Sequence, residues 1–300
     1  MRAQRLVNAR PRAGTCSTGE LPALVAALDA EFVAGRGRSG SLAWRYPDLL
    51  REQNLANVHV RRHAGRIVSC CAVRRFTWTS DRERWTGAMI GLVYTAPQAR
   101  GRGHAAHVLE DAVDALAAAG CDFAVLWSGL DGYYERLGWE PHDRGIFGSV
   151  DGVGAPSPLA ADGIDVARYD ALRAPQAKAR VARDATSYRC VPLPAARVAS
   201  VFACSDDDEA AALVGEAAGA RYVYEVVGAA AALPALWQAL VDGAAAVHVN
   251  HSIRTPFHRW LTAHTPIEFA AQELAYWRML SPRARRAAWR DWHIPYFDRI

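Results

Sequence analysis

One short segment constrains the fold of this chain more than any other: PQARGRGHAAHVLEDAV, residues 97–113. The apolar run GLVYTA precedes it, which is typical of a strand. After the turn, apolar residues recur at the spacing of one helical face, at Ala105, Val108, Leu109, Ala112, Val113 and Leu116. The pattern therefore predicts a strand, a tight glycine turn and an amphipathic helix.

A glycine turn at the start of a helix is suited to binding an anion. The first backbone N–H groups of the helix lack partners, and the helix dipole adds positive charge there. Gly101 and Gly103 let the backbone curl closely around a diphosphate, and Arg100 and Arg102 add charge at the rim. The segment lacks both the GxGxxG of dinucleotide-binding folds and the Gly-Lys-Ser/Thr of a phosphate-binding P-loop. Taken alone, it is equally consistent with a solvent-exposed arginine turn.

The composition excludes several classes of protein. Half of the 300 residues are hydrophobic and 22% are charged, which is typical of one large or two ordinary packed domains. A net charge of +4 is too small to indicate nucleic-acid binding, and no run of about 20 apolar residues could span a bilayer. The N-terminus lacks the apolar core of a signal peptide. We therefore expect a cytoplasmic protein without nucleic-acid or membrane partners, while homo-oligomerisation is left open.

The order of predicted elements divides the chain into two similar halves, each with a helix, a meander of strands, a second helix and a short strand. The first half opens with a predicted strand over 5–11 and ends near residue 150. The segment 151–163 is rich in Gly, Pro and Ala, which is typical of a linker. The second half, 164–300, opens with a predicted helix over 166–183 and closes with a basic, Trp-rich helix and an extended tail. The predicted fold class is α/β, with mixed sheets in two tandem domains.

Six cysteines show no CxxC spacing, so we expect buried free thiols and no metal site. His248 and His251 are three residues apart on a predicted strand and would face opposite sides, which argues against a metal pair.

Two linked motifs resemble the GNAT superfamily of N-acyltransferases. Gln98-x-x-Gly101-x-Gly103-x-Ala105 is similar to its acyl-CoA signature, and FAVLWSGLDGYYERLGWEP at 123–141 is similar to its second motif. The resemblance covers roughly residues 5–150. The tandem arrangement resembles the enhanced intracellular survival type, in which the first domain binds acetyl-CoA and the second does not. EVVGAAAALPALWQ stands where the second domain's phosphate loop would be, and the sequence ends without that family's C-terminal sterol-carrier-like domain.

The resemblance implies acetyl-CoA as the acyl donor and assigns roles to particular residues. The strand backbone at Leu92, Val93 and Tyr94 would hold the thioester. The CoA-binding turn would comprise Gln98, Arg100, Gly101, Arg102, Gly103, His104 and Ala105.

Tyr134 matches the superfamily tyrosine that protonates the CoA thiolate, since a phenol with a pKa near 10 is protonated at neutral pH. The alternative is that Tyr133 and Tyr134 are both core aromatics. Ser128 would contact the pantetheine arm or serve as a turn hydroxyl.

The general base is not identifiable, because the strand WTGAMIGLVYT carries no carboxylate. Glu83, Asp131, Glu225, His104 and the C-terminal carboxylate of Ile300 are candidates, as is a chain of water molecules. A C-terminal carboxylate acts in the tandem family named above, but the tail differs here, so that role is not carried over.

The predicted function is acetyl transfer to a primary amine of a small molecule, with an antibiotic or other secondary metabolite suggested only by analogy. The alternatives are transfer of a longer acyl group, acylation of a protein amine, and a CoA-binding sensor or scaffold without turnover.

Overall fold

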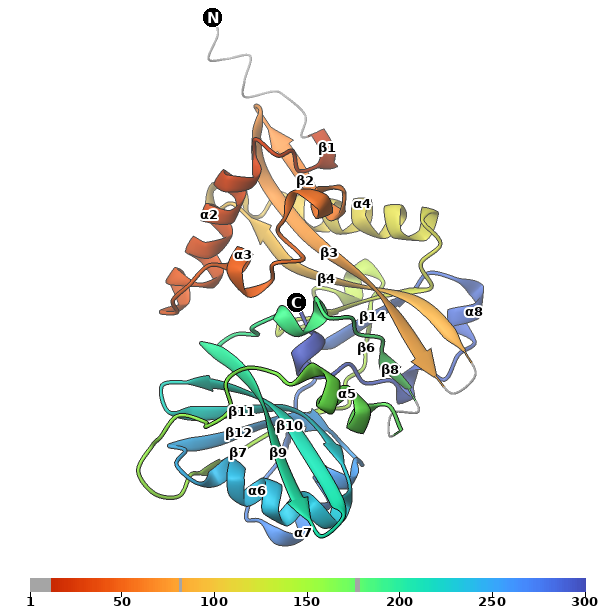
Figure 1. The fold of residues 1–300 in the computed structure, drawn as a ribbon. Coiled ribbons are helices and arrows are strands. Elements are labelled where there is room, and N and C mark those ends of the chain that lie inside the picture. Colours follow the sequence, from red (N-terminus) through yellow and green to blue (C-terminus); the bar gives the residue numbers. More distant parts are fainter. Residues whose placement is uncertain (1–11, 81–82, 176–178) are drawn as a thin grey trace, which may run out of the picture.

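The computed structural model describes residues 12–80, 83–175 and 179–300, which form two mixed sheets covered by helices (Figure 1). The mixed α/β class predicted from the sequence is confirmed. The strand predicted over 5–11 lies outside the described residues. All six cysteines are free, and Cys204 alone among them is exposed.

The first sheet is built largely from the N-terminal half. Its strands run in the order β1 (Arg12–Thr15), β2 (Val58–His63), β3 (Arg66–Ser80), β4 (Arg84–Thr95), β5 (Phe123–Trp127), β14 (Ala275–Met279) and β6 (Glu140–Pro141), and β8 (Ala179–Val181) also pairs with β3. Only β4 and β5 pair in parallel. Alternate residues of β3 pack under α4 (His104–Ala118) on one face and under α2 (Leu21–Phe32) and α3 (Leu42–Arg45) on the other.

The second sheet follows the same plan. Its strands run in the order β13 (Ala270–Ala271), β7 (Gly145–Asp151), β12 (Ala246–Ser252), β11 (Ala220–Gly228), β10 (Asp208–Ala217) and β9 (Arg197–Ser205). Only β11 and β12 pair in parallel. Two helices, α6 (Leu233–Val241) and α7 (Pro256–His264), cover one face of the sheet, and α5 (Val166–Arg173) packs on the opposite face.

The two halves exchange a strand. In the first sheet β14, from the C-terminal part of the chain, pairs with both β5 and β6. In the second sheet β7, from the N-terminal half, pairs with both β12 and β13. The exchange is reciprocal, so each sheet is completed by the other half of the chain. The predicted linker at 151–163 therefore follows a strand that already belongs to the second sheet, and the division at that point stays a prediction.

Two predicted helices are shorter than expected. The helix predicted over 166–183 ends at Arg173, and Pro175, which has no backbone N–H to continue the helical hydrogen bonds, follows its C-cap Ala174. The Trp-rich tail forms only α8 (Pro282–Arg285) and single 3₁₀ turns at 289–291 and 296–298. Trp289 and Trp292 pack with Trp78, Trp85 and Trp277 in an aromatic cluster on the first sheet, and this packing replaces a continuous helix. The chain then runs between the two sheets to its C-terminal end (Figure 1).

Candidate functional site

Strand β4 carries a bulge in the middle of the predicted thioester-binding segment. Gly91 pairs with Ala72, and Tyr94 pairs with Cys70, so the two residues Leu92 and Val93 face a single residue of β3. Leu92 has a φ of +51°, which is uncommon for a residue with a side chain. A bulge leaves its extra residue outside the regular ladder. Side chains of β3 bond to two of the carbonyls here, because Ser69 Oγ donates to Tyr94 at 2.8 Å and Cys70 Sγ donates to Leu92 at 3.7 Å. The binding of a thioester by this segment stays a prediction.

The strands β4 and β5 separate beside this bulge. Their parallel pairing covers only Gly87–Met89 against Phe123–Val125. Past these residues the ladder stops, and the two strands lead to different elements, the glycine turn and the loop that holds Tyr134. The opening between them is where the sequence predicts the pantetheine arm.

The predicted phosphate turn has the backbone that its glycines were expected to allow. Gly101 and Gly103 have φ values of +74° and +73°, and Gly103 is the N-cap of α4. No atom lies within 4 Å of a Cβ built at Gly101, so the backbone conformation rather than crowding requires glycine there. The 15-residue helix α4 begins at His104 directly behind the turn. Its N-terminal N–H groups and dipole therefore face the side where a phosphate would bind.

The side chains of the turn differ in whether they are free to contact a ligand. Gln98 and Arg102 are exposed, and Ala105 lies in the first helical turn. Arg100 donates to the Thr95 carbonyl at 3.1 Å and pairs with Glu31 at 2.8 Å, so its charge is already partly engaged. His104 is buried, and burial together with the nearby Arg61 and Arg102 lowers the pKa of its imidazole. Arg102 is thus the cation of the turn without an ion-pair partner among the described residues.

Tyr134 is buried, with 4% of its surface exposed, in an aromatic environment. Its ring lies 5.0 Å from Tyr133, 5.2 Å from Tyr276 and 6.4 Å from Trp139, measured between ring centroids. Burial raises the pKa of the phenol to about 12, and a hydrogen bond with Ser128 opposes that shift. The phenol therefore keeps its proton throughout the neutral range. Tyr134 thus packs in the aromatic core, as the alternative expected, and its role as a proton donor stays a prediction.

Ser128 joins β5 to the Tyr134 loop. Its N–H donates to the Leu274 carbonyl at 2.8 Å, and its Oγ accepts from the N–H of Leu130 at 3.2 Å. Ser128 is therefore a turn hydroxyl that also contacts the Tyr134 phenol. Its contact with a pantetheine arm stays a prediction.

The structure brings Ile300 to the bulge of β4. A Cβ built at Gly91 would lie 2.8 Å from the carboxyl carbon of Ile300. Glycine in a strand interior often marks the close approach of another backbone, so Gly91 was the available sequence signal. The backbone of Ile300 thus lies beside the predicted thioester position.

A buried ion network holds this tail in place. Arg183 donates to both carboxylate oxygens of Asp298 at 2.8 Å and to Glu225 at 2.6 Å, with its side chain fully buried. Glu225 lies in β11 of the second sheet, and Arg173 of α5 also pairs with it, at 3.3 Å. The tail that reaches Gly91 is therefore anchored to the second sheet.

The other candidate bases lie elsewhere. Glu83 is exposed at the β3–β4 hairpin opposite Arg283, and Asp131 is exposed in the loop after β5. Glu225 is engaged by Tyr169, Arg173 and Arg183 in the second sheet. None of these three carboxylates lies against the bulge of β4.

The chain was compared with protein families and with solved structures. Residues 20–142 match the family described as an acetyltransferase (GNAT) domain. Solved structures share the fold over nearly the whole chain. A GCN5-related N-acetyltransferase from Kribbella flavida has 16% identity and a TM-score of 0.65, over 94% of this chain and 74% of that one. One from Anabaena variabilis has 14% identity and a TM-score of 0.66, over 91% and 73%.

Eis1 from Mycobacterium abscessus has 15% identity and a TM-score of 0.55, over 90% of this chain and 74% of that one. No curated protein sequence matches the chain. Identities this low establish a shared fold and nothing finer, and that fold includes the tandem arrangement of the two halves. Residues 20–142 are a GNAT acetyltransferase domain, and the enzyme class that this domain defines is N-acyltransferase.

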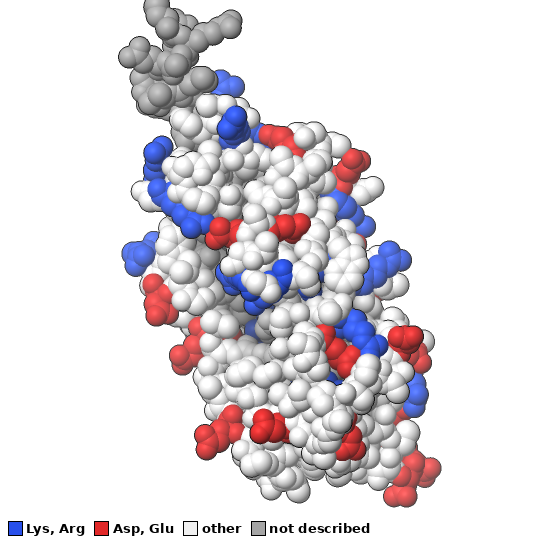
Figure 2. All heavy atoms as spheres, turned by 90° about the vertical axis from the view of Figure 1, so that its left-hand side faces the viewer, with Lys and Arg blue, Asp and Glu red and all other residues white. Residues whose placement is uncertain are grey.

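Charge distribution, metal ligands and helix length bear on other classes of site. Figure 2 shows basic and acidic side chains interspersed over one face, with no large area of a single sign. Within residues 12–80, 83–175 and 179–300 no group of His, Cys, Asp and Glu is placed to hold a metal ion. No helix of the described chain is long and apolar enough to cross a membrane.

Proposed function

We propose that this protein transfers an acetyl group from acetyl-CoA to a primary amine of a small molecule. One observation carries the proposal: past the end of its pairing with β5, strand β4 carries the bulge and leads to the glycine turn, and Tyr134 packs in one core cluster with Val93 of the bulge. The turn fits a diphosphate, the bulge offers backbone groups to a thioester carbonyl, and Tyr134 offers a proton to a sulfur. A diphosphate site, a carbonyl-binding site and a proton donor for sulfur together fit CoA better than a nucleotide or a peptide.

Acetyl-CoA supplies the thioester when it is bound, and the chain's own groups provide the rest of the chemistry. Backbone N–H groups near Leu92 and Val93 stabilise the negative charge that develops on the carbonyl oxygen as the amine nitrogen attacks. The bond from carbon to sulfur then breaks, and the Tyr134 phenol donates a hydrogen bond and finally a proton to the leaving sulfur. A pKa of about 12 keeps this donor protonated, but it also makes complete proton transfer uphill against a thiol with a pKa near 8.5. Tyr134 therefore acts mainly by hydrogen bonding in the transition state.

The amine must lose a proton before it attacks, and a chain of water molecules is the proposed acceptor of this proton. None of the candidate side-chain carboxylates lies against the bulge, because Glu225 is engaged in the second sheet and Glu83 faces Arg283.

The proposal is tested by release of CoA thiol from acetyl-CoA in the presence of a panel of primary amines. We expect release that depends on both the amine and the enzyme. The competing CoA-sensor function predicts that acetyl-CoA raises the melting temperature while no amine supports release. Transfer of a longer acyl group would appear as faster release from butyryl-CoA or hexanoyl-CoA than from acetyl-CoA.

A further inference from the structure

The second sheet contains a counterpart of the opening between β4 and β5. Its single parallel pair, β11 with β12, covers only Ala220–Val223 against Ala246–Val249. Strand β11 has a bulge directly after this pairing, because Val223 pairs with Val214 while Glu225 pairs with Leu213, which leaves Tyr224 as the extra residue. Parallel pair, bulge and divergence thus occur in the same order in both sheets.

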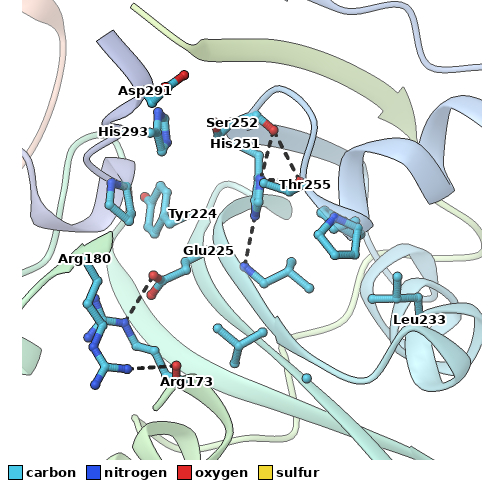
Figure 3. Close-up of a pocket in the computed structure, with 16 residues that line it drawn as sticks. Arg173, Arg180, Tyr224, Glu225, Leu233, His251, Ser252, Thr255, Asp291 and His293 are labelled. Carbon is cyan, nitrogen blue, oxygen red and sulfur yellow. Dashed lines mark hydrogen bonds and ion pairs between the residues drawn. The ribbon is translucent and has the colours of Figure 1, made fainter. Parts of the chain in front are cut away.

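This second opening is not arranged for CoA. His251 of β12 extends across it, and its Nε2 accepts the N–H of Val226 at 3.3 Å (Figure 3). A backbone N–H of the kind that a thioester carbonyl would use is therefore already engaged. The segment that follows β11 enters α6 through alanines and a proline, without the glycine turn that precedes α4. The second opening therefore has no glycine turn for a phosphate among the described residues, and the His251 side chain partly fills the position that corresponds to the thioester.

A cavity of about 230 Å³ nevertheless remains at the divergence. Its volume corresponds to about eight water molecules at about 30 Å³ each. Leu233, Phe257 and Tyr224 provide apolar walls, while Arg180, His251 and His293 provide polar groups. The tail segment carrying His293 closes one side of the cavity, opposite the two strands (Figure 3).

Each charged side chain that lines the cavity has an ion-pair partner among the described residues, except Arg180. Glu225 pairs with Arg173 and Arg183, and Asp291 pairs with Arg144 at 2.6 Å. Arg180 is half-buried and has no ion-pair partner among the described residues. One of its nitrogens, Nη1, donates to the carbonyls of Arg173 and Ala174 at 3.0 and 2.9 Å, and the other N–H groups of the guanidinium remain for a ligand.

One further feature favours an anion there. The nine-residue helix α7 begins at the cavity, with Thr255 as its N-cap and Phe257 in its first turn. The N-terminal end of a helix carries partial positive charge. Burial lowers the pKa values of His251 and His293 and favours their neutral forms, so Arg180 and the helix end supply the positive charge.

We propose that this cavity binds a small carboxylic acid, with its carboxylate on Arg180 and its hydrocarbon body against Phe257 and Leu233. The site is distinct from the acyl-transfer site, which lies between β4 and β5 of the first sheet. The cavity lies where two parallel strands of the second sheet separate, and there we expect it to bind a free acid instead of a CoA thioester. The unpaired guanidinium, the helix N-terminus and the apolar walls each contribute to this choice of ligand.

The test uses three probes of nearly equal size that differ in charge: hexanoate, hexylammonium and 1-hexanol. Each is titrated into the full chain and its binding is measured by isothermal calorimetry at pH 7. We expect hexanoate to bind more tightly than the other two by at least tenfold, because a hydrogen bond to a charged group is worth about that factor. Equal binding of the three probes, or no binding of hexanoate, would overturn the proposal without any variant.

Variants then locate the site. Arg180→Gln should weaken hexanoate binding at least tenfold, and Arg259→Gln, the same change on the exposed side of α7, should leave it unchanged. Arg180→Glu should reverse the preference, so that hexylammonium binds and hexanoate does not. Hexanoate binding that survives both changes at Arg180 would place the ligand elsewhere and refute the assignment.

Discussion

Tyr134 is the single residue on which the proposed chemistry depends most. Tyr134→Phe removes the hydroxyl and keeps the ring that packs on Tyr133, Tyr276 and Trp139. We expect kcat to fall about 100-fold, a typical contribution of a positioned proton donor, while the KM for acetyl-CoA changes little. Steady-state kinetics check this result. Tyr133→Phe is the matched control, and equal losses in both variants would indicate a packing effect.

The raised pKa of Tyr134 has a consequence for the pH profile. Its neutral phenol is the form that donates, and burial raises the pKa from 10 to about 12, so ionisation is delayed to more alkaline pH. We therefore expect no loss of kcat assignable to this residue between pH 7 and 10.5, where an ordinary tyrosine would already be ionising. Profiles of kcat in the native chain and in Tyr134→Phe check this. A descending limb near pH 9 that disappears in the variant would contradict it.

At the scale of elements, the glycine turn in front of α4 acts through its backbone. Gly103→Val places a β-branched residue at a φ of +73°, with a strain of about 1–3 kcal/mol, and so distorts the N–H groups that would meet a diphosphate. Arg102→Ala removes only an exposed charge. We expect Gly103→Val to weaken CoA binding at least tenfold and Arg102→Ala to weaken it about threefold, as measured by calorimetry. The opposite order would mean that side-chain charge dominates the site.

Elements with local signals were predictable from the sequence. The apolar strand, the glycines and the helical spacing of 84–118 identified β4, the turn and α4, because each depends on neighbouring residues. The exchange of β7 and β14 was not visible, since pairing between strands that lie far apart in the sequence leaves no local periodicity. The bulge at Leu92 was equally hidden, because nothing in a short apolar run marks an extra residue. His251 was considered only as a metal ligand, although its contact is with the backbone of a strand 25 residues away.

At the scale of the whole molecule, the exchanged strands join the two halves. A fragment that ends at residue 144 lacks β14, so β5 loses its neighbour and Tyr276 no longer covers Tyr134. We expect this fragment to aggregate or to show no cooperative thermal transition, since it exposes an unpaired strand edge and part of the core. Calorimetry of the fragment and of the full chain checks this. A cooperative transition in the fragment would show that the first half folds without the exchange.

The buried ion network links the second sheet to the tail. Arg183→Met leaves Glu225 and Asp298 without their shared cation, and breaking a buried pair costs about 3–5 kcal/mol of unfolding free energy. The arginines lower the pKa of Glu225 to about 2, below its unfolded value near 4.3, so its contribution is present above pH 4.3 and is lost as the pH falls towards 2. Denaturant unfolding of both proteins at pH 7 and pH 3 measures the effect. A variant as stable as the native chain at pH 7 would contradict it.

The most direct test of acyl transfer is mass spectrometry of amines from a metabolite extract after incubation with acetyl-CoA and the full chain. We predict that at least one primary amine gains a single acetyl group, and that the product forms far more slowly with Tyr134→Phe. Acetyl-CoA that remains intact beside every amine in the extract, while still raising the melting temperature of the protein, would contradict acyl transfer and leave a CoA-binding protein without turnover.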